Sequence, residues 1–101
     1  MNLEKIIAVA KKKKYSIVKQ DNLKELLFQS KIIIEKDTHI SDKIRLLKLD
    51  DDLIIQEKTT KDELIIRIVK TKNEAEDFIK QRLEIYDRMW DGCGCKVEYY
   101  V

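Results

Sequence analysis

The stretch KIRLLKLDDDLIIQEKTTKDELIIRIVK, residues 43–70, decides the fold. It holds three apolar-rich runs of similar length, separated by the aspartates 50–52 and by the polar residues 59–62. In the last run, Leu64, Ile66 and Ile68 alternate with residues that would face the other side of a strand. Short connections between strands of similar length favour antiparallel pairing. The stretch therefore predicts a three-strand meander over about 43–70.

A long helix over about 73–90 is predicted after the meander. Thr71 with Glu74, or Asn73 with Glu76, fits a capping box at its start. The residues that would line its apolar face recur at helical spacing: Ala75, Phe78, Ile79, Leu83, Tyr86, Met89 and Trp90. Gly92 suits the end of this helix, and residues 96–101 then predict a final strand.

Two shorter helices and two strands are predicted before the meander. Asn2 caps a first helix that runs to about Lys13 with an i, i+3, i+4, i+7 apolar stripe. A strand follows over 15–19, and a second helix, capped by Asn22 with Glu25, ends near residue 30. Three consecutive isoleucines in 31–36 predict a well-buried strand.

Together these elements predict one α+β domain over 1–101. A mainly antiparallel sheet combines the meander with strands near 15–19, 31–36 and 96–101; the long helix about 73–90 and two shorter N-terminal helices pack on it.

The composition agrees with a globular domain. The chain has 101 residues, of which 44% are hydrophobic and 40% charged, so it is too apolar for a disordered tail and too charged for a membrane span. The apolar run at 6–10 precedes its lysines, the reverse of a secretory signal, so we expect a cytoplasmic protein that does not enter a membrane.

The pair Cys93 and Cys95, separated by Gly94, is the most unusual local feature. Buried packing is the leading interpretation, because cysteine commonly packs as a small hydrophobic residue. A thiophilic metal such as zinc is an alternative, with His39 and a carboxylate, or the thiolates of a second copy, completing four ligands. A strained, easily reduced disulfide is the third alternative.

A run of four lysines, Lys11, Lys12, Lys13 and Lys14, makes the N-terminal region basic. Such a cluster could bind nucleic-acid phosphates. A solvated helix end is the leading interpretation, because only Tyr15 supplies a neighbouring aromatic ring. The sequence pI of about 8.5 also lies below the values above roughly 9 that are typical of nucleic-acid-binding domains.

The expected function is that of a small non-enzymatic binding or interaction domain. Gly92 and Gly94 are the sole glycines, so there is no glycine-rich phosphate loop, and no catalytic triad is recognisable. Nucleic-acid binding through the lysine run and metal or redox chemistry at the cysteines are the alternatives. Aromatic residues late in the chain, with an edge strand at 96–101, predict a homodimer, and a protein partner is expected.

Overall fold

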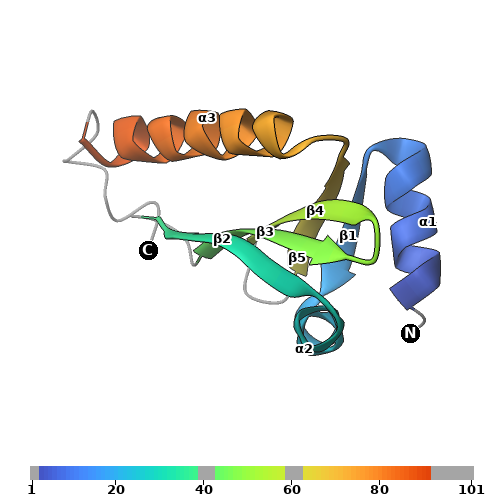
Figure 1. Ribbon diagram of the computed structural model, residues 1–101. Coiled ribbons are helices and arrows are strands. Elements are labelled where there is room, and N and C mark those ends of the chain that lie inside the picture. Colours follow the sequence, from blue (N-terminus) through green and yellow to red (C-terminus); the bar gives the residue numbers. More distant parts are fainter. Residues whose placement is uncertain (1–2, 39–42, 59–62, 92–101) are drawn as a thin grey trace.

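The computed structural model describes residues 3–38, 43–58 and 63–91 (Figure 1). The elements are, in chain order, α1 (Leu3–Lys13), β1 (Tyr15–Lys19), α2 (Gln20–Gln29), β2 (Lys31–Asp37), β3 (Lys43–Leu49), β4 (Asp52–Lys58), β5 (Glu63–Val69) and α3 (Lys72–Asp91). The predicted α+β class and the long C-terminal helix are therefore confirmed.

The five strands form one antiparallel sheet in the order β1-β5-β4-β3-β2. The strands β3, β4 and β5 pair in sequence, with Leu46 opposite Ile55 and Ile55 opposite Arg67, so the predicted meander is confirmed. Strands β1 and β2 add to opposite sides of the meander. The helix α2, which joins them, therefore connects the two edges of the described sheet (Figure 1).

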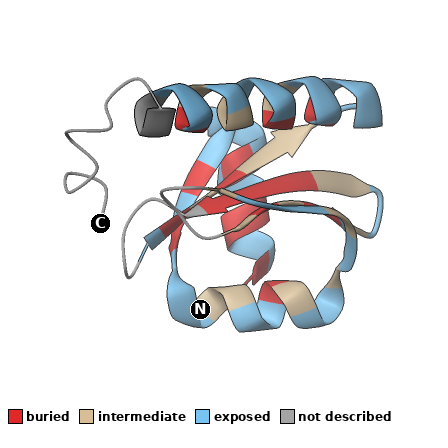
Figure 2. Ribbon diagram, turned by 90° about the vertical axis from the view of Figure 1, so that its left-hand side faces the viewer, coloured by how far each residue is buried: buried red, intermediate tan, exposed pale blue. Residues whose placement is uncertain are grey.

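Helices cover both faces of this sheet. Adjacent apolar residues in the central strands, such as Ile54 and Ile55, point to opposite faces because side chains alternate along a strand. One core lies between the sheet and the helices α1 and α2, and the other lies between the sheet and α3. Figure 2 shows that the outward surface of α3 is exposed while its buried residues face the sheet. The domain thus has three layers.

The start of α3 is fixed by the first of the two predicted capping boxes. The hydroxyl of Thr71 accepts a hydrogen bond from the Glu74 N–H at 3.1 Å, and the Glu74 carboxylate accepts one from the Lys70 N–H at 3.2 Å. Ala75 and Ile79 then face the sheet and are buried. No helix in the described ranges, α3 included, is long and apolar enough to cross a membrane.

Two local predictions in the first half of the chain are wrong. Helix α2 starts at Gln20 rather than at a cap on Asn22, and its N-cap residue Lys19 makes no side-chain capping hydrogen bond. The isoleucine-rich strand β2 is not well buried, because it lies at an edge of the described sheet; Ile32 is 45% exposed. The cap on Asn2 and the strand at 96–101 fall outside the described residues.

Candidate functional site: the groove between β2 and α3

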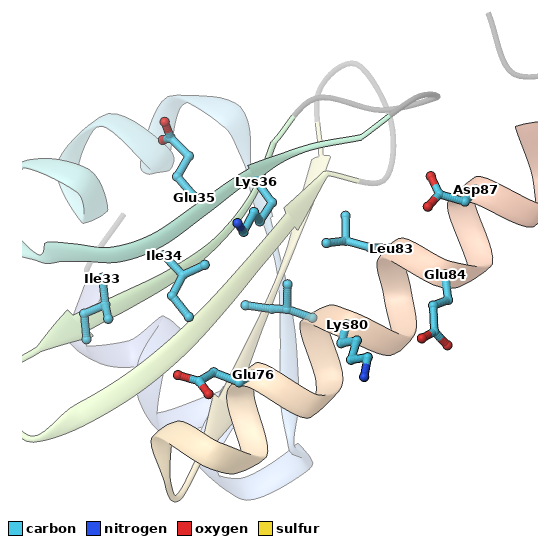
Figure 3. A pocket seen from close by; sticks show the side chains of 10 residues that line it. Ile33, Ile34, Glu35, Lys36, Glu76, Lys80, Leu83, Glu84 and Asp87 are labelled. Carbon is cyan, nitrogen blue, oxygen red and sulfur yellow. The ribbon is translucent and has the colours of Figure 1, made fainter.

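An open groove with a volume of about 640 Å³ lies between the edge strand β2 and helix α3 (Figure 3). Its apolar surface comes from Ile33 and Ile34 on the strand and from Ile79 and Leu83 on the helix. Leu83 and both strand isoleucines are half-buried, so they contact the second core and still face solvent in part. The groove is therefore an extension of the core that the described elements leave uncovered.

A β-bulge in β2 explains why two consecutive isoleucines reach this groove. Ile32 pairs with Leu47 and Ile34 pairs with Leu46, so Ile33 is an extra residue between them. A bulge interrupts the alternation of side chains along a strand. Ile33 and Ile34 consequently both pack with the α3 core, whereas Ile32 pairs with a residue of the α1–α2 core.

The rim of the groove is charged. The exposed side chains of Glu76, Lys80, Glu84 and Asp87 follow one another along α3, and Lys36 lies on the strand side. These groove residues of α3 comprise three carboxylates and one lysine, so the helix side of the rim is acidic. Glu35 is a further lining residue, but Figure 3 shows its side chain pointing away from α3.

Strand β2 also presents backbone hydrogen-bonding groups beside the groove. It pairs with β3 on one side, and within the described sheet no strand pairs with its other side. The N–H and C=O groups that do not face β3 are therefore available to another extended chain. Apolar side chains and an edge of the described sheet thus meet in one place.

On the same face of the sheet, Glu57, Arg82 and Tyr86 form a buried polar cluster. The Glu57 side chain is 4% exposed and accepts a hydrogen bond from Arg82 Nε at 2.8 Å. The Tyr86 hydroxyl donates to the same carboxylate, and Arg82 Nη2 lies 3.1 Å from that hydroxyl. Burial, together with the hydrogen bond to Glu57, raises the pKa of Tyr86 to about 12. The three groups satisfy one another, which anchors α3 to β4.

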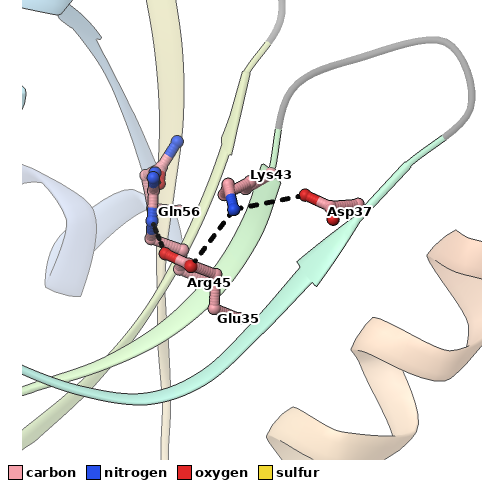
Figure 4. Close-up of polar contacts among 5 residues, drawn as sticks. All are labelled: Glu35, Asp37, Lys43, Arg45 and Gln56. Atoms are coloured by element: carbon pink, nitrogen blue, oxygen red, sulfur yellow. Dashed lines mark hydrogen bonds and ion pairs between the residues drawn. The ribbon is translucent and has the colours of Figure 1, made fainter.

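On the opposite face, a second polar cluster joins β2, β3 and β4 (Figure 4). Arg45 donates to Glu35 and to the buried Gln56, both at 2.7 Å, and Lys43 lies 3.3 Å from both Glu35 and Asp37. Hydrogen bonds from Arg45 and Lys43 lower the pKa of Glu35, and the Asp37 contact raises the pKa of Lys43. Because these charges pair internally, the cluster fastens β2 to the sheet.

The predicted phosphate-binding lysines lie at the end of α1. Lys11, Lys12 and Lys13 form the last turn of the helix, and Lys14 follows with a positive φ of 74°. All four are exposed, but Lys11 forms an ion pair with Asp52 at 3.1 Å. The other three lysines are thus exposed at the end of α1.

The candidate metal ligands Cys93, Cys95 and His39 lie outside the described residues. Within the described ranges, no group of three or more His, Cys, Asp and Glu side chains could hold a metal ion.

Sequence reasoning missed both the groove and the Glu57–Arg82–Tyr86 cluster, and of the two the cluster alone has a signal in the sequence. Glu57 falls on the same strand face as Ile55, and Arg82 lies four residues before Tyr86 on the inward side of α3. A charge at an apolar position on both elements indicates a buried pair.

Comparison of the chain with protein-family models, with curated proteins and with solved structures gave no match.

Proposed function

We propose that this protein is a non-enzymatic interaction domain that binds an extended, partly apolar polypeptide segment in the β2–α3 groove. The observation that carries the proposal is the coincidence of an apolar groove with the edge strand β2, whose outer side pairs with no other strand of the described sheet. In β-strand addition, backbone hydrogen bonds to such an edge supply affinity, and pockets for alternate side chains supply specificity.

The shape of the groove favours a polypeptide over a small molecule. Its volume of about 640 Å³ is within the range of roughly 300–1,000 Å³ found for small-molecule sites. Such sites, however, enclose most of the ligand surface, whereas this groove is open to solvent. An extended segment would cover Ile33, Ile34 and Leu83 and pair with β2 at the same time.

The rim sets the charge that the ligand should carry. Three carboxylates, Glu76, Glu84 and Asp87, line the helix side with Lys80 among them, and Glu76 also forms an ion pair with Lys72 at 3.8 Å. A segment whose apolar residues alternate with lysines would place its valines or aromatic rings against the groove and its positive charges near this rim. Charge of this kind mainly affects the association rate and the choice of partner.

The test uses a labelled six-residue peptide of alternating lysine and valine, with fluorescence anisotropy as the readout. We expect saturable binding that Leu83→Glu, in the groove, weakens at least tenfold. The matched control is Phe28→Glu, because Phe28 is 90% exposed on α2 and is not a groove residue. Circular dichroism checks that both variants fold, and Ile33→Thr provides a milder groove variant that retains β-branching.

A second peptide separates groove binding from simple charge attraction. It keeps the lysines and replaces each valine with serine. If both peptides bind equally well, or if Leu83→Glu and Phe28→Glu behave alike, then the groove is not the binding site and the proposed function is wrong.

Nucleic-acid binding is a second candidate because the structure adds an arginine to the aromatic residue beside the lysines. The guanidinium carbon of Arg67 lies between two rings, 5.9 Å from the centre of Tyr15 and 5.2 Å from the centre of Phe78, and Tyr15 is 44% exposed. Rings and cations together form the surfaces on which unpaired bases stack. We expect the triple substitution of Lys12, Lys13 and Lys14 by Gln to weaken the binding of random DNA and RNA. The loss of affinity should be the same for all nucleotide sequences. Undetectable binding by the unmodified protein at low salt would remove this candidate.

A further inference from the structure

The sequence itself contains a segment that fits the groove. It continues for ten residues after α3 ends at Asp91. In its last six residues, 96–101, Val97, Tyr99 and Val101 alternate with Lys96, Glu98 and Tyr100. β-branched and aromatic residues at every second position favour a strand with one apolar side. The alternation matches the apolar groove, whereas of its two charged residues only Lys96 complements the acidic rim.

We propose that residues 96–101 occupy the β2–α3 groove of their own molecule, as a strand paired with the free edge of β2. The inference rests on the proposed function, since it names the first ligand of the same groove. It makes the groove self-occupied, so an outside segment must compete with residues 96–101.

The direction of α3 supports this arrangement. The helix starts just after Val69, which pairs with Leu53 near the start of β4. Further along the helix, Arg82 contacts Glu57 near the end of β4. The helix therefore runs in the same direction as β4. Because two antiparallel pairings separate β2 from β4, β2 points the same way. A chain that reverses after α3 therefore returns antiparallel to β2, the pairing used throughout the sheet.

The lengths also agree. Asp87 is the last groove residue on α3, so the helix ends four residues, about one turn, beyond the groove. Residues 92–95 include Gly92 and Gly94 and supply a connection of ordinary length for a reversal. Six extended residues then span roughly 20 Å, close to the roughly 23 Å of the seven-residue strand β2.

Linkage within one chain favours this ligand over a free one. A short tether gives the attached segment an effective concentration on the order of millimolar, so even weak contacts keep it bound. Val97, Tyr99 and Val101 would face Ile79 and Leu83, and Lys96 would enter at the end of the groove where Glu84 lies.

Hydrogen exchange of the full-length chain tests the inference directly. We expect the β2 amides that do not face β3 to be protected in the unmodified protein, and Tyr99→Asp to speed their exchange at least tenfold. The matched control is Tyr100→Asp, which makes the same change on the other side of the strand and should have a smaller effect. Unprotected β2 amides in the unmodified protein, or equal effects of the two variants, would overturn the inference.

Competition separates failure of the inference from failure of the proposed function. The lysine–valine peptide should bind Tyr99→Asp at least tenfold more tightly than it binds the unmodified protein. Equal binding to both would leave the proposed function standing and overturn self-occupation. If neither protein binds the peptide, the proposed function fails and hydrogen exchange alone decides the inference. Protection of β2 that rises with protein concentration would mean that a second copy supplies the segment, which also overturns the inference.

Discussion

At the scale of single residues, the contact between Arg82 and Glu57 is a buried polar interaction that joins α3 to β4. The Glu57 side chain is 4% exposed, so removing its cationic partner leaves a buried carboxylate with the Tyr86 hydroxyl as its remaining hydrogen-bond donor. We expect Arg82→Met to lower the free energy of unfolding by about 2–4 kcal/mol, less than for a fully buried pair because Arg82 is 31% exposed.

Urea unfolding measures this loss, and Arg88→Met is the matched control. Arg88 is exposed on the same helix, so its removal should change the stability by less than about 0.5 kcal/mol. The double variant Glu57→Leu with Arg82→Met removes both charges and should recover much of the loss. Equal stability of Arg82→Met and Arg88→Met would show that the buried pair does not hold α3 in place.

The hydroxyl of Tyr86 should make stability depend on alkaline pH. Its folded-state pKa of about 12 lies above the ordinary value of 10, so the folded protein retains this proton longer than the unfolded chain does. The resulting stabilisation, about 2–3 kcal/mol, is fully present below pH 10 and is lost as the pH rises through 12. Urea unfolding at about pH 9 and about pH 11.5 should show a larger loss in the unmodified protein than in Tyr86→Phe. Identical losses would contradict the buried environment of Tyr86.

At the scale of elements, α3 is held by one buried stripe. Ile79 is 3% exposed, whereas the next residue, Lys80, is exposed at the rim of the groove. We expect Ile79→Ala to cost about 2–4 kcal/mol, in the range of large-to-small changes in a core, and Lys80→Ala to cost less than about 0.5 kcal/mol. Thermal or urea unfolding measures both changes. A loss below about 0.5 kcal/mol for Ile79→Ala would mean that this stripe is not part of the core.

The periodic elements could be predicted because their patterns persist over several residues. The alternation of Leu64, Ile66 and Ile68 placed one face of β5 correctly, and these residues belong to the α1–α2 core. The Thr71–Glu74 capping box set the start of α3 to within a residue. Both signals are local, since backbone geometry alone connects the residues concerned.

Strand β2 shows where local patterns fail. Three consecutive isoleucines predict a strand buried on both faces, and the strand exists, but its exposure depends on which elements lie beside it. The bulge at Ile33 depends on register with β3, which no property of residues 31–37 alone determines. The groove was unpredictable for the same reason, because it joins Ile33 and Ile34 to residues more than forty positions later.

At the scale of the whole molecule, the order of the strands creates the candidate site. The crossover through α2 sends β2 to the edge farthest from β1, and α3 returns over the meander from β5. Helix α3 contacts β4 and β5 most closely, so the face of β2 that carries Ile33 and Ile34 is left partly open beside it. The groove is thus a consequence of topology, and its apolar lining is the part that the residues supply.

The same topology leads to a prediction about the mass of the protein in solution. The aromatic residues of the C-terminal region predicted a homodimer, and the groove offers an arrangement that covers Tyr99 within one molecule. With residues 96–101 in their own groove, the edge of β2 is no longer available to a second copy. We therefore expect light scattering at micromolar concentration to give a mass near 12.0 kDa that does not change when the sample is concentrated. A mass of about twice this value, reduced to one chain by Tyr99→Asp, would instead establish the homodimer and show that the segment crosses between copies.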